Sequence, residues 1–160
     1  MNIRSVGLGE IVVSRNPEDI LVAFGLGSCL GIGLYDPTTH VAGLLHAVLP
    51  ENPNGSTDPS AKFVNTGVIS ILEEMKKNGA NLQKITIRMA GGANMLTSPA
   101  LSKTFDIGTR NIAAAHKIFD QLHYRLTAED VGGNIGRTVR LYIVDGKMTV
   151  RVIGSQEKEI

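Results

Sequence analysis

Residues 25–36 read Gly-Leu-Gly-Ser-Cys-Leu-Gly-Ile-Gly-Leu-Tyr-Asp, and the prediction of the fold depends on this stretch. Its first part is rich in glycine, which allows the backbone to bend sharply and another molecule to come close. Its second part, residues 30–35, is a short apolar run before Asp36-Pro37 and predicts a buried strand. Cys29, the single cysteine among 160 residues, therefore lies on a bend between two strands.

The next apolar run, residues 41–49, contains His46 and stops at Pro50, so it predicts a further strand. If this strand forms a hairpin with residues 30–35, His46 returns toward Cys29. A lone cysteine together with a histidine elsewhere in the sequence is a candidate nucleophile and base. Simple burial in the core is the alternative interpretation, because free cysteine is among the most buried residue types.

The composition excludes several classes of partner. Lysine and arginine total 16 against 15 for aspartate and glutamate, a net charge of +1, so no overall field selects nucleic acid or an anionic membrane. One cysteine cannot form an internal disulfide, and we recognise neither a secretory signal nor an apolar run of membrane-spanning length. We expect a cytoplasmic protein whose residues 1–160 form one domain, with no nucleic acid partner and no membrane insertion.

Strands and one clear helix are expected in the first half of the chain. Residues 6–14 predict an edge strand, and residues 20–24 predict a short strand that leads into the glycines. The loop at residues 51–60 contains Asp58-Pro59, a pair typical of a helix N-terminus. After this pair, apolar side chains recur at helical spacing until Asn78-Gly79, which predicts a helix with a C-terminal stop.

The second half continues with alternating elements. Residues 85–90 alternate as a strand, residues 112–123 repeat at helical spacing, residues 124–128 are a short strand candidate, and residues 129–134 predict a turn. Residues 137–144 and 147–153 flank Asp145-Gly146, which is a strong hairpin signal. The order of strands, helix, strand, helix and strands predicts an α+β fold of mixed or antiparallel sheets with two outer helices.

Neither a nucleotide loop nor a metal site is indicated. The glycines around Cys29 do not form Gly-x-Gly-x-x-Gly before a helix, and no Gly-Lys-Ser/Thr follows them. A zinc site would use Cys29 and His46 with two further ligands, yet no Cys/His pair has the usual ligand spacing; the other candidate ligands are the acids and His40, His116 and His123. We therefore expect no metal and no cofactor.

Several short blocks occur in an order that covers nearly the whole chain. They are Gly25-x-Gly27-Ser28-Cys29 with Leu34-Tyr35-Asp36, His46, Leu49-Pro50, Gly91-Gly92-Ala93, Ile107-Gly108-x-Arg110-Asn111 and Asp130-x-Gly132-Gly133-x-x-Gly136-Arg137. No single block is specific, but the ordered set resembles the CheD family of chemoreceptor glutamine deamidases from bacteria and archaea.

The resemblance implies a three-layer-like α/β sandwich with helices outside mixed strands, similar to the catalytic domain of cytotoxic necrotizing factor toxins. It also implies a protein-glutamine glutaminase, a cysteine hydrolase that converts glutamine to glutamate in the cytoplasmic region of methyl-accepting chemotaxis proteins. On this resemblance, Cys29 is the nucleophile and His46 is the general base and acid. The backbone N–H groups of Gly27 and Ser28 are candidates to hold the oxyanion.

One position departs from the family pattern. CheD proteins usually carry a threonine six residues before the cysteine, where its hydroxyl orients the histidine, and this sequence has Ala23 there. A backbone carbonyl or a water molecule could orient His46 instead. Loss of one neutral hydrogen bond costs about 0.5–1.5 kcal/mol, which corresponds to roughly twofold to tenfold in rate.

The resemblance leaves two other functions open. Family members associate with the CheC phosphatase of the response regulator CheY and stimulate it, which needs no catalysis, so the chain is alternatively a weakly catalytic or non-catalytic binding partner of CheC. Phe105, in a polar loop, is a candidate contact for such a partner. The thiolate of Cys29 could also attack an ester, which would make the protein a methylesterase acting on receptor glutamyl methyl esters.

Overall fold

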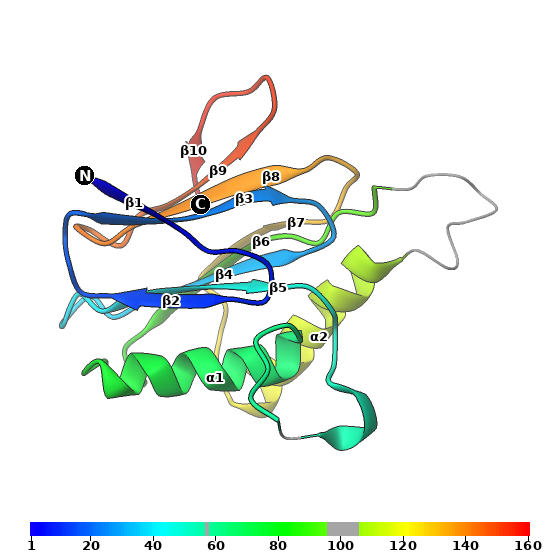
Figure 1. Ribbon diagram of the computed structural model, residues 1–160, viewed down its shortest axis with the longest axis horizontal. Helices are drawn as coiled ribbons and strands as arrows, with labels where there is room; N and C mark the ends of the chain where they lie inside the picture. Colours follow the sequence, from blue (N-terminus) through cyan, green and yellow to red (C-terminus); the bar gives the residue numbers. More distant parts are fainter. Residues whose placement is uncertain (57, 96–105) are drawn as a thin grey trace.

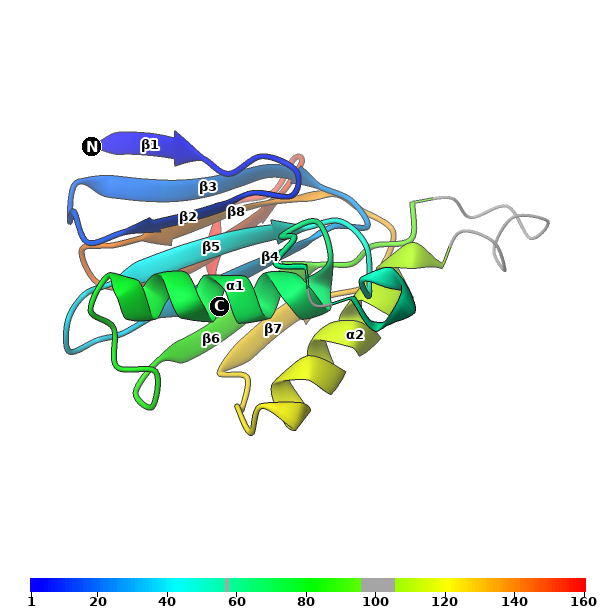
Figure 2. The same cartoon turned by 60° about the horizontal axis from the view of Figure 1, so that its bottom comes forward.

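The computed structural model of the chain describes residues 1–56, 58–95 and 106–160. These residues form three layers, in which two five-stranded sheets pack face to face and two helices cover the outer face of the second sheet (Figures 1 and 2). We call the sheets A and B. Sheet A has the strand order β1-β3-β8-β9-β10, and sheet B has the order β2-β5-β4-β6-β7.

Both sheets mix parallel and antiparallel neighbours, because β1 runs parallel to β3 and β6 runs parallel to β7. The strands of sheet A are β1 (Asn2–Ser5), β3 (Asp19–Leu26), β8 (Arg137–Tyr142), β9 (Met148–Val152) and β10 (Lys158–Glu159). Those of sheet B are β2 (Ile11–Ser14), β4 (Leu30–Tyr35), β5 (Ala42–Ala47), β6 (Thr86–Gly91) and β7 (Ala128–Val131). The helices are α1 (Val64–Lys77), α2 (Ile107–Gln121) and a short 3-10 helix, η1 (Pro53–Gly55). The expected α+β fold with mixed sheets and outer helices is confirmed.

Two apolar layers hold the sheets and helices together. All six residues of β4 are buried, because sheet A covers one face of this strand and the helices cover the other. Leu30, Ile32 and Leu34 pack on the helical side, whereas a Cβ atom on Gly31 would meet side chains of sheet A. The unbroken apolar run of residues 30–35 is the sequence signal of this double burial.

Three further predictions are confirmed. β4 and β5 form the expected antiparallel hairpin. α1 ends at Asn78, and Gly79 has a φ of 95°, a conformation that favours glycine. β8 and β9 pair around Asp145-Gly146, where Gly146 has a φ of 75°.

The prediction that Asp58-Pro59 begins the first helix is wrong, because α1 begins at Val64 and has no side-chain cap. The intervening residues pair with the end of β5 instead: the carbonyl of Lys62 accepts hydrogen bonds from the N–H groups of Val48 and Leu49. This tertiary pairing outweighs the local capping signal.

Three boundaries also differ from the prediction. Residues 6–14 do not form one strand, because β2, an edge strand of sheet B, begins only at Ile11. α2 begins at Ile107, ahead of residue 112, where the apolar spacing starts. Of residues 124–128 only Ala128 is in a strand. It begins β7, which otherwise occupies part of the predicted turn, because parallel pairing places Ala128 opposite Arg88 of β6.

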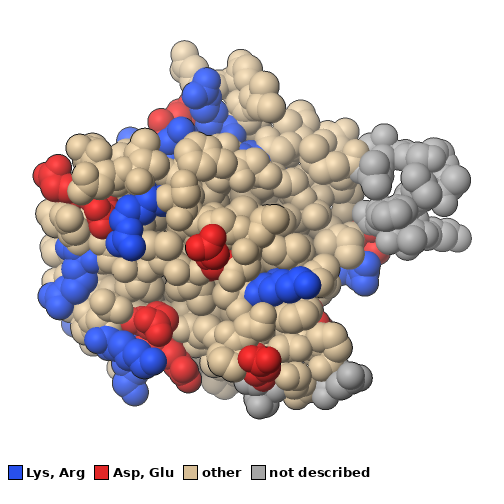
Figure 3. All heavy atoms as spheres, in the orientation of Figure 1, with Lys and Arg blue, Asp and Glu red and all other residues tan. Residues whose placement is uncertain are grey.

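The surface is mixed in charge. On the face shown in Figure 3, Lys and Arg side chains alternate with Asp and Glu side chains, in keeping with the net charge of +1. No helix within the described residues is long and apolar enough to cross a membrane.

Candidate active site

Cys29 lies where strands of both sheets reach the same end of the molecule. β3 ends at Leu26, the chain bends, and β4 begins at Leu30. β5 runs antiparallel to β4, so its last residue, Ala47, pairs with Leu30. Cys29 is half-buried at this end and packs against the apolar layer between the two sheets.

The carbonyl groups of the bend before β4 are all engaged. The carbonyl of Gly27 accepts a hydrogen bond from the N–H of Ala93 at 2.9 Å, and that of Cys29 accepts one from the N–H of Gly92 at 2.9 Å. The carbonyl of Ser28 is held by a side chain of α2. By contrast, the backbone N–H groups of Gly27 and Ser28 have no acceptor among the residues that the structure describes, whereas that of Cys29 interacts with its own thiol. The bend therefore keeps two backbone donors available for a ligand.

Asn111 of α2 is the side chain that holds Ser28. It is fully buried, and its Nδ2 atom donates to the carbonyl of Ser28 at 2.8 Å and to the carbonyl of Val48 at 3.0 Å. It thereby joins the residue before Cys29 to the segment that follows β5. The sequence placed Asn111 in a motif block, but its spacing gave no sign of these two acceptors.

Two glycines allow the segments around the bend to approach closely. A Cβ atom on Gly91, which has a φ of 114°, would overlap the carbonyl oxygen of Cys29. A Cβ atom on Gly108, in the first turn of α2, would overlap the carbonyl oxygen of Gly92. Only glycine fits both positions. The blocks Gly91-Gly92-Ala93 and Ile107-Gly108-x-Arg110-Asn111 therefore pack directly against the bend.

The last sequence block also meets this end of the molecule. Arg137 Nη1 donates to the carbonyl of Gly91 at 3.2 Å, and Arg137 Nη2 forms an ion pair with Asp130 at 3.4 Å. The N–H of Gly132 donates to the same carbonyl of Gly91 at 2.9 Å. Blocks that are far apart in the sequence thus support one cluster around Cys29.

Residues 6–10 hold His46 at three points. The Nδ1 atom of His46 lies 2.9 Å from the carbonyl oxygen of Val6. The N–H of His46 donates to the carbonyl of Glu10 at 3.1 Å, and its carbonyl accepts from the N–H of Gly9 at 2.8 Å. Val6 itself is fixed to β3, because its N–H donates to the carbonyl of Val22 at 2.8 Å. The ring of His46 in sheet B is therefore positioned by the edge of sheet A.

The carbonyl of Val6 determines the tautomer of the His46 ring. A carbonyl oxygen only accepts hydrogen bonds, so in the neutral ring Nδ1 carries the proton and Nε2 carries the lone pair. His46 is 3% exposed, and its Nε2 atom is buried without a partner among the described residues. The ring is thus held in the form that can accept a proton at Nε2.

Cys29 and His46 face the same layer but are not hydrogen-bonded to each other. Gly31 lies directly opposite His46 in the ladder of β4 and β5, which places Cys29 at the diagonal position on the same face. Gly31 has no side chain that would separate them. Burial raises the pKa of the Cys29 thiol, although its own backbone N–H partly offsets this effect. The resting residue is therefore a thiol, and its reaction as a nucleophile requires a base.

Ala23 is fully buried in the layer between the sheets, opposite Val139 of β8. Its methyl group has no polar atom with which to orient His46. Of the two substitutes that the sequence left open, a backbone carbonyl is the one found, and it belongs to Val6. Phe105, the candidate partner contact, lies outside the described residues.

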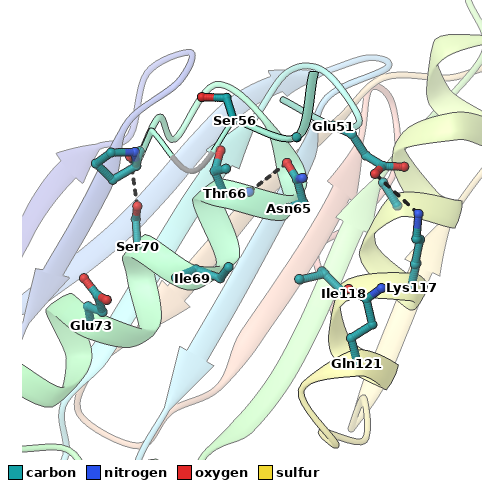
Figure 4. A pocket seen from close by; sticks show the side chains of 13 residues that line it. Glu51, Ser56, Asn65, Thr66, Ile69, Ser70, Glu73, Lys117, Ile118 and Gln121 are labelled. Carbon is teal, nitrogen blue, oxygen red and sulfur yellow. Dashed lines mark hydrogen bonds and ion pairs between the residues drawn. The ribbon is translucent and has the colours of Figure 1, made fainter. Parts of the chain in front are cut away.

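A separate hollow lies in the helical layer. It is a groove of about 630 Å³ between α1 and α2. Figure 4 shows Asn65 and Ser70 of α1 on one side of the groove and Lys117 of α2 on the other. The groove is formed by the helical layer, whereas Cys29 and His46 face the layer between the sheets, so it does not belong to the candidate site. In the described part of the chain, no group of three or more His, Cys, Asp or Glu side chains could hold a metal ion.

Known proteins resemble this chain over almost its whole length. A relative from Caldanaerobacter subterraneus subsp. tengcongensis, named "Probable chemoreceptor glutamine deamidase CheD", is 42% identical over 159 residues, which are 99% of this chain and 98% of that relative. A protein of Thermotoga maritima, named "Chemoreceptor glutamine deamidase CheD", is 39% identical over 96% of this chain and 94% of its own length. One from Pyrococcus abyssi is 43% identical over 94% and 93%.

The family described as "CheD chemotactic sensory transduction" matches residues 48–152, which contain three of the blocks that surround Cys29. Cys29 and His46 precede this range and are covered by the alignments with the full-length relatives. The chain belongs to the CheD family.

Proposed function

We propose that the protein is a chemoreceptor glutamine deamidase, which hydrolyses the side-chain amide of specific glutamines in methyl-accepting chemotaxis receptors and so adjusts chemotactic signalling and adaptation. The names of its relatives support both the reaction and the substrate. One observation carries the assignment of the site: His46, whose Nε2 atom has no partner among the described residues, lies opposite Gly31 and faces the layer between the sheets, against which Cys29 also packs. A substrate in the cytoplasmic region of a receptor places the enzyme in the cytoplasm.

In the proposed reaction, Nε2 of His46 removes the proton of the Cys29 thiol. The Nδ1 atom keeps its own proton and continues to donate a hydrogen bond to the carbonyl of Val6. The thiolate sulfur attacks the carbonyl carbon of the glutamine side chain and forms a C–S bond. The C–N bond then breaks, and protonated His46 gives its proton to the leaving nitrogen, which departs as ammonia. A water molecule hydrolyses the thioester, which leaves glutamate and restores the thiol.

The bend supplies a place for the developing negative charge. The N–H groups of Gly27 and Ser28 are the proposed oxyanion donors, and their availability among the described residues supports this role. The hydrogen bonds to the carbonyls of Gly27, Ser28 and Cys29 hold these donors in place before the substrate arrives. Preorganised donors of this kind lower the barrier because they need no rearrangement during the reaction.

The alternative function is that of a binding partner that stimulates the CheC phosphatase with weak or no catalysis of its own. Two observations favour it: Ala23 takes the place of the family threonine, and burial raises the pKa of the Cys29 thiol. We also propose that residues 1–160 act as a single domain. A likeness to the catalytic domain of cytotoxic necrotizing factor toxins is part of the proposal, and superposition of the two folds tests it.

The test is release of ammonia and methanol from a chemoreceptor cytoplasmic fragment that carries both glutamines and glutamyl methyl esters, measured together with capture of the same fragment and of CheC. The deamidase proposal predicts ammonia with the unaltered protein and none with Cys29→Ala, while capture is the same for both proteins. If the unaltered protein captures CheC and releases neither ammonia nor methanol, the binding function is the correct one. Methanol without ammonia would identify a methylesterase.

A further inference from the structure

The end of sheet A next to the candidate site carries large apolar side chains that the described residues leave uncovered. Phe24 is 52% exposed, Met95 is 53% exposed, and Ile153 is 94% exposed. These residues come from three separate parts of the chain, yet all three line one hollow of about 560 Å³. A contiguous apolar patch on a soluble protein usually marks an interaction site.

Phe24 faces the solvent because side chains alternate along β3, where Leu21 and Ala23 face the layer between the sheets, and a β-bulge begins at this point of the strand. The pairing of β3 with β8 shifts between Ala23 and Leu26, so Phe24 and Gly25 are left outside the regular ladder. Gly25 has a φ of 62°, and its N–H lies 3.4 Å from the hydroxyl oxygen of Thr138. Bulges of this kind redirect a side chain and are frequent next to active sites. This bulge lies only a few residues before Cys29.

Basic side chains adjoin the apolar ones. The bulge places Phe24 beside Thr138 of β8, and Thr138 pairs with Arg151 of β9. Arg140, two residues along β8, lies on the same face as Thr138 and lines the same hollow. No acidic residue lines the hollow. Hydrogen bonds lower the pKa of Glu157 most, and the charge of nearby Arg140 lowers it further, but Arg140 and Glu157 are not within ion-pair distance. Arg151 has no ion pair with a carboxylate of the described residues.

The hollow is continuous with the bend that carries Cys29. Gly27 is part of its lining, and a Cβ atom on Gly27 would lie 3.3 Å from Met95 Cγ. Gly27 is also one of the proposed oxyanion donors, two residues before Cys29. The hollow lies on the outer face of sheet A, and a polypeptide in it passes within two residues of Cys29 at the end of this sheet.

We propose that this surface, which we name the Phe24 surface (Phe24, Met95, Arg140, Arg151 and Ile153), docks a segment of the protein substrate that carries Asp or Glu beside apolar side chains. The two arginines select the acidic side chains, and the apolar residues bury those of the substrate. The target glutamine is thereby presented to Cys29. This inference rests on the proposed function, because it concerns the substrate of the same site.

The test measures binding separately from turnover. The full-length protein carrying Cys29→Ala binds a fluorescently labelled chemoreceptor cytoplasmic fragment, and Kd is followed by fluorescence anisotropy. We expect Phe24→Ser, and separately Arg140→Glu with Arg151→Glu, to weaken binding at least about tenfold. The matched controls are Ile69→Ser and Lys76→Glu on α1, which should change Kd by less than about twofold. Raising NaCl from about 50 to about 500 mM should weaken binding of the fragment more for the parent protein than for the double arginine variant.

The proposal is overturned if the surface variants bind the fragment as tightly as the controls do, or if the parent protein does not bind it at all. It is also overturned if Phe24→Ser abolishes self-association of the chain and leaves binding of the fragment unchanged, because a second copy would then be the occupant. Ammonia release is measured with Cys29 restored. If the surface variants release ammonia normally and bind the fragment with unchanged Kd, the docking proposal alone is refuted. If the surface variants lose binding but the unaltered protein releases no ammonia, the deamidase proposal alone is refuted.

Discussion

Replacement of Asn111 by alanine should destabilise the protein and also impair catalysis, because this side chain joins the bend before Cys29 to the segment after β5. The substitution removes two hydrogen bonds, of 2.8 Å to the carbonyl of Ser28 and 3.0 Å to the carbonyl of Val48. A neutral hydrogen bond contributes about 1 kcal/mol net, and leaving its carbonyl without a donor in the interior raises the cost toward about 2 kcal/mol, so the two bonds together account for about 2–4 kcal/mol. Asn111 Oδ1 has no partner among the described residues, so its removal adds no further loss. We expect Asn111→Ala to lower the free energy of unfolding by about 2–4 kcal/mol.

The assay is urea unfolding at pH 7 together with kcat on the receptor fragment, measured at a temperature at which the variant is fully folded. Thr109→Ala is the matched control on the same helix, because its side-chain hydrogen bond to Asn94 is exposed, and it should change the free energy of unfolding by less than about 0.5 kcal/mol. Since Asn111 fixes the residue before the nucleophile, kcat should fall at least about tenfold, with KM little changed. A destabilisation as small as that of the control, or a full kcat in the folded variant, would refute the positioning role.

Three further predictions concern charge, packing and the thiol. Asp36→Asn should lower the free energy of unfolding at pH 7 by about 2–4 kcal/mol, while Asp120→Asn at an exposed position should not. Burial alone would raise the pKa of Asp36, but hydrogen bonds from Asn81, Thr38 and Thr39 outweigh burial and lower this pKa. Their stabilisation is therefore present above the unfolded pKa of about 3.9 and is lost at lower pH. Urea unfolding at several pH values checks this, and a deficit that persists at the lowest pH contradicts it. Gly91→Ala should prevent stable folding or lower the free energy of unfolding by more than about 3 kcal/mol, because the added Cβ atom would overlap the carbonyl of Cys29. Gly132→Ala, where the Cβ atom has open space and only φ is unfavourable, should cost about 1 kcal/mol. Thermal unfolding measures both, and equal losses would refute this. Because burial raises the pKa of Cys29, its alkylation by iodoacetamide should still accelerate above about pH 9, and a plateau below pH of about 8 would contradict this.

The sequence predicts elements whose signals are local. β4 is predicted at its observed bounds because an apolar run between a glycine-rich bend and Asp36-Pro37 admits one interpretation. The hairpin at Asp145-Gly146 is predicted for a similar reason, since its turn chemistry lies in two adjacent residues. By contrast, β1 has four exposed residues without an apolar pattern, and its existence depends on parallel pairing with β3. The start of α1 depends on pairing of Lys62 with the end of β5, which overrides the capping signal of Asp58-Pro59.

The candidate site divides in the same way. Cys29 and His46 can be selected from residue type and order, and the pairing of β4 with β5 follows from two apolar runs and a turn. The carbonyl of Val6 could not be predicted, because a backbone acceptor 40 residues away from His46 leaves no trace in residue type. The outward position of Phe24 follows from alternation along β3, because Leu21 and Ala23 face the layer between the sheets. The register shift that returns Leu26 to this layer is not predicted, and its only sequence signal is Gly25.

The central claim is that Cys29 attacks the glutamine amide with His46 as its base. The most direct test is mass-spectrometric detection of the gain of about 1 Da at individual glutamines of a receptor cytoplasmic fragment, followed over time with the unaltered protein, Cys29→Ala and His46→Ala. We predict conversion by the unaltered protein and a loss of at least about a thousandfold in both variants, each confirmed as folded by urea unfolding. Conversion by folded Cys29→Ala or His46→Ala at a rate near that of the unaltered protein would contradict the account.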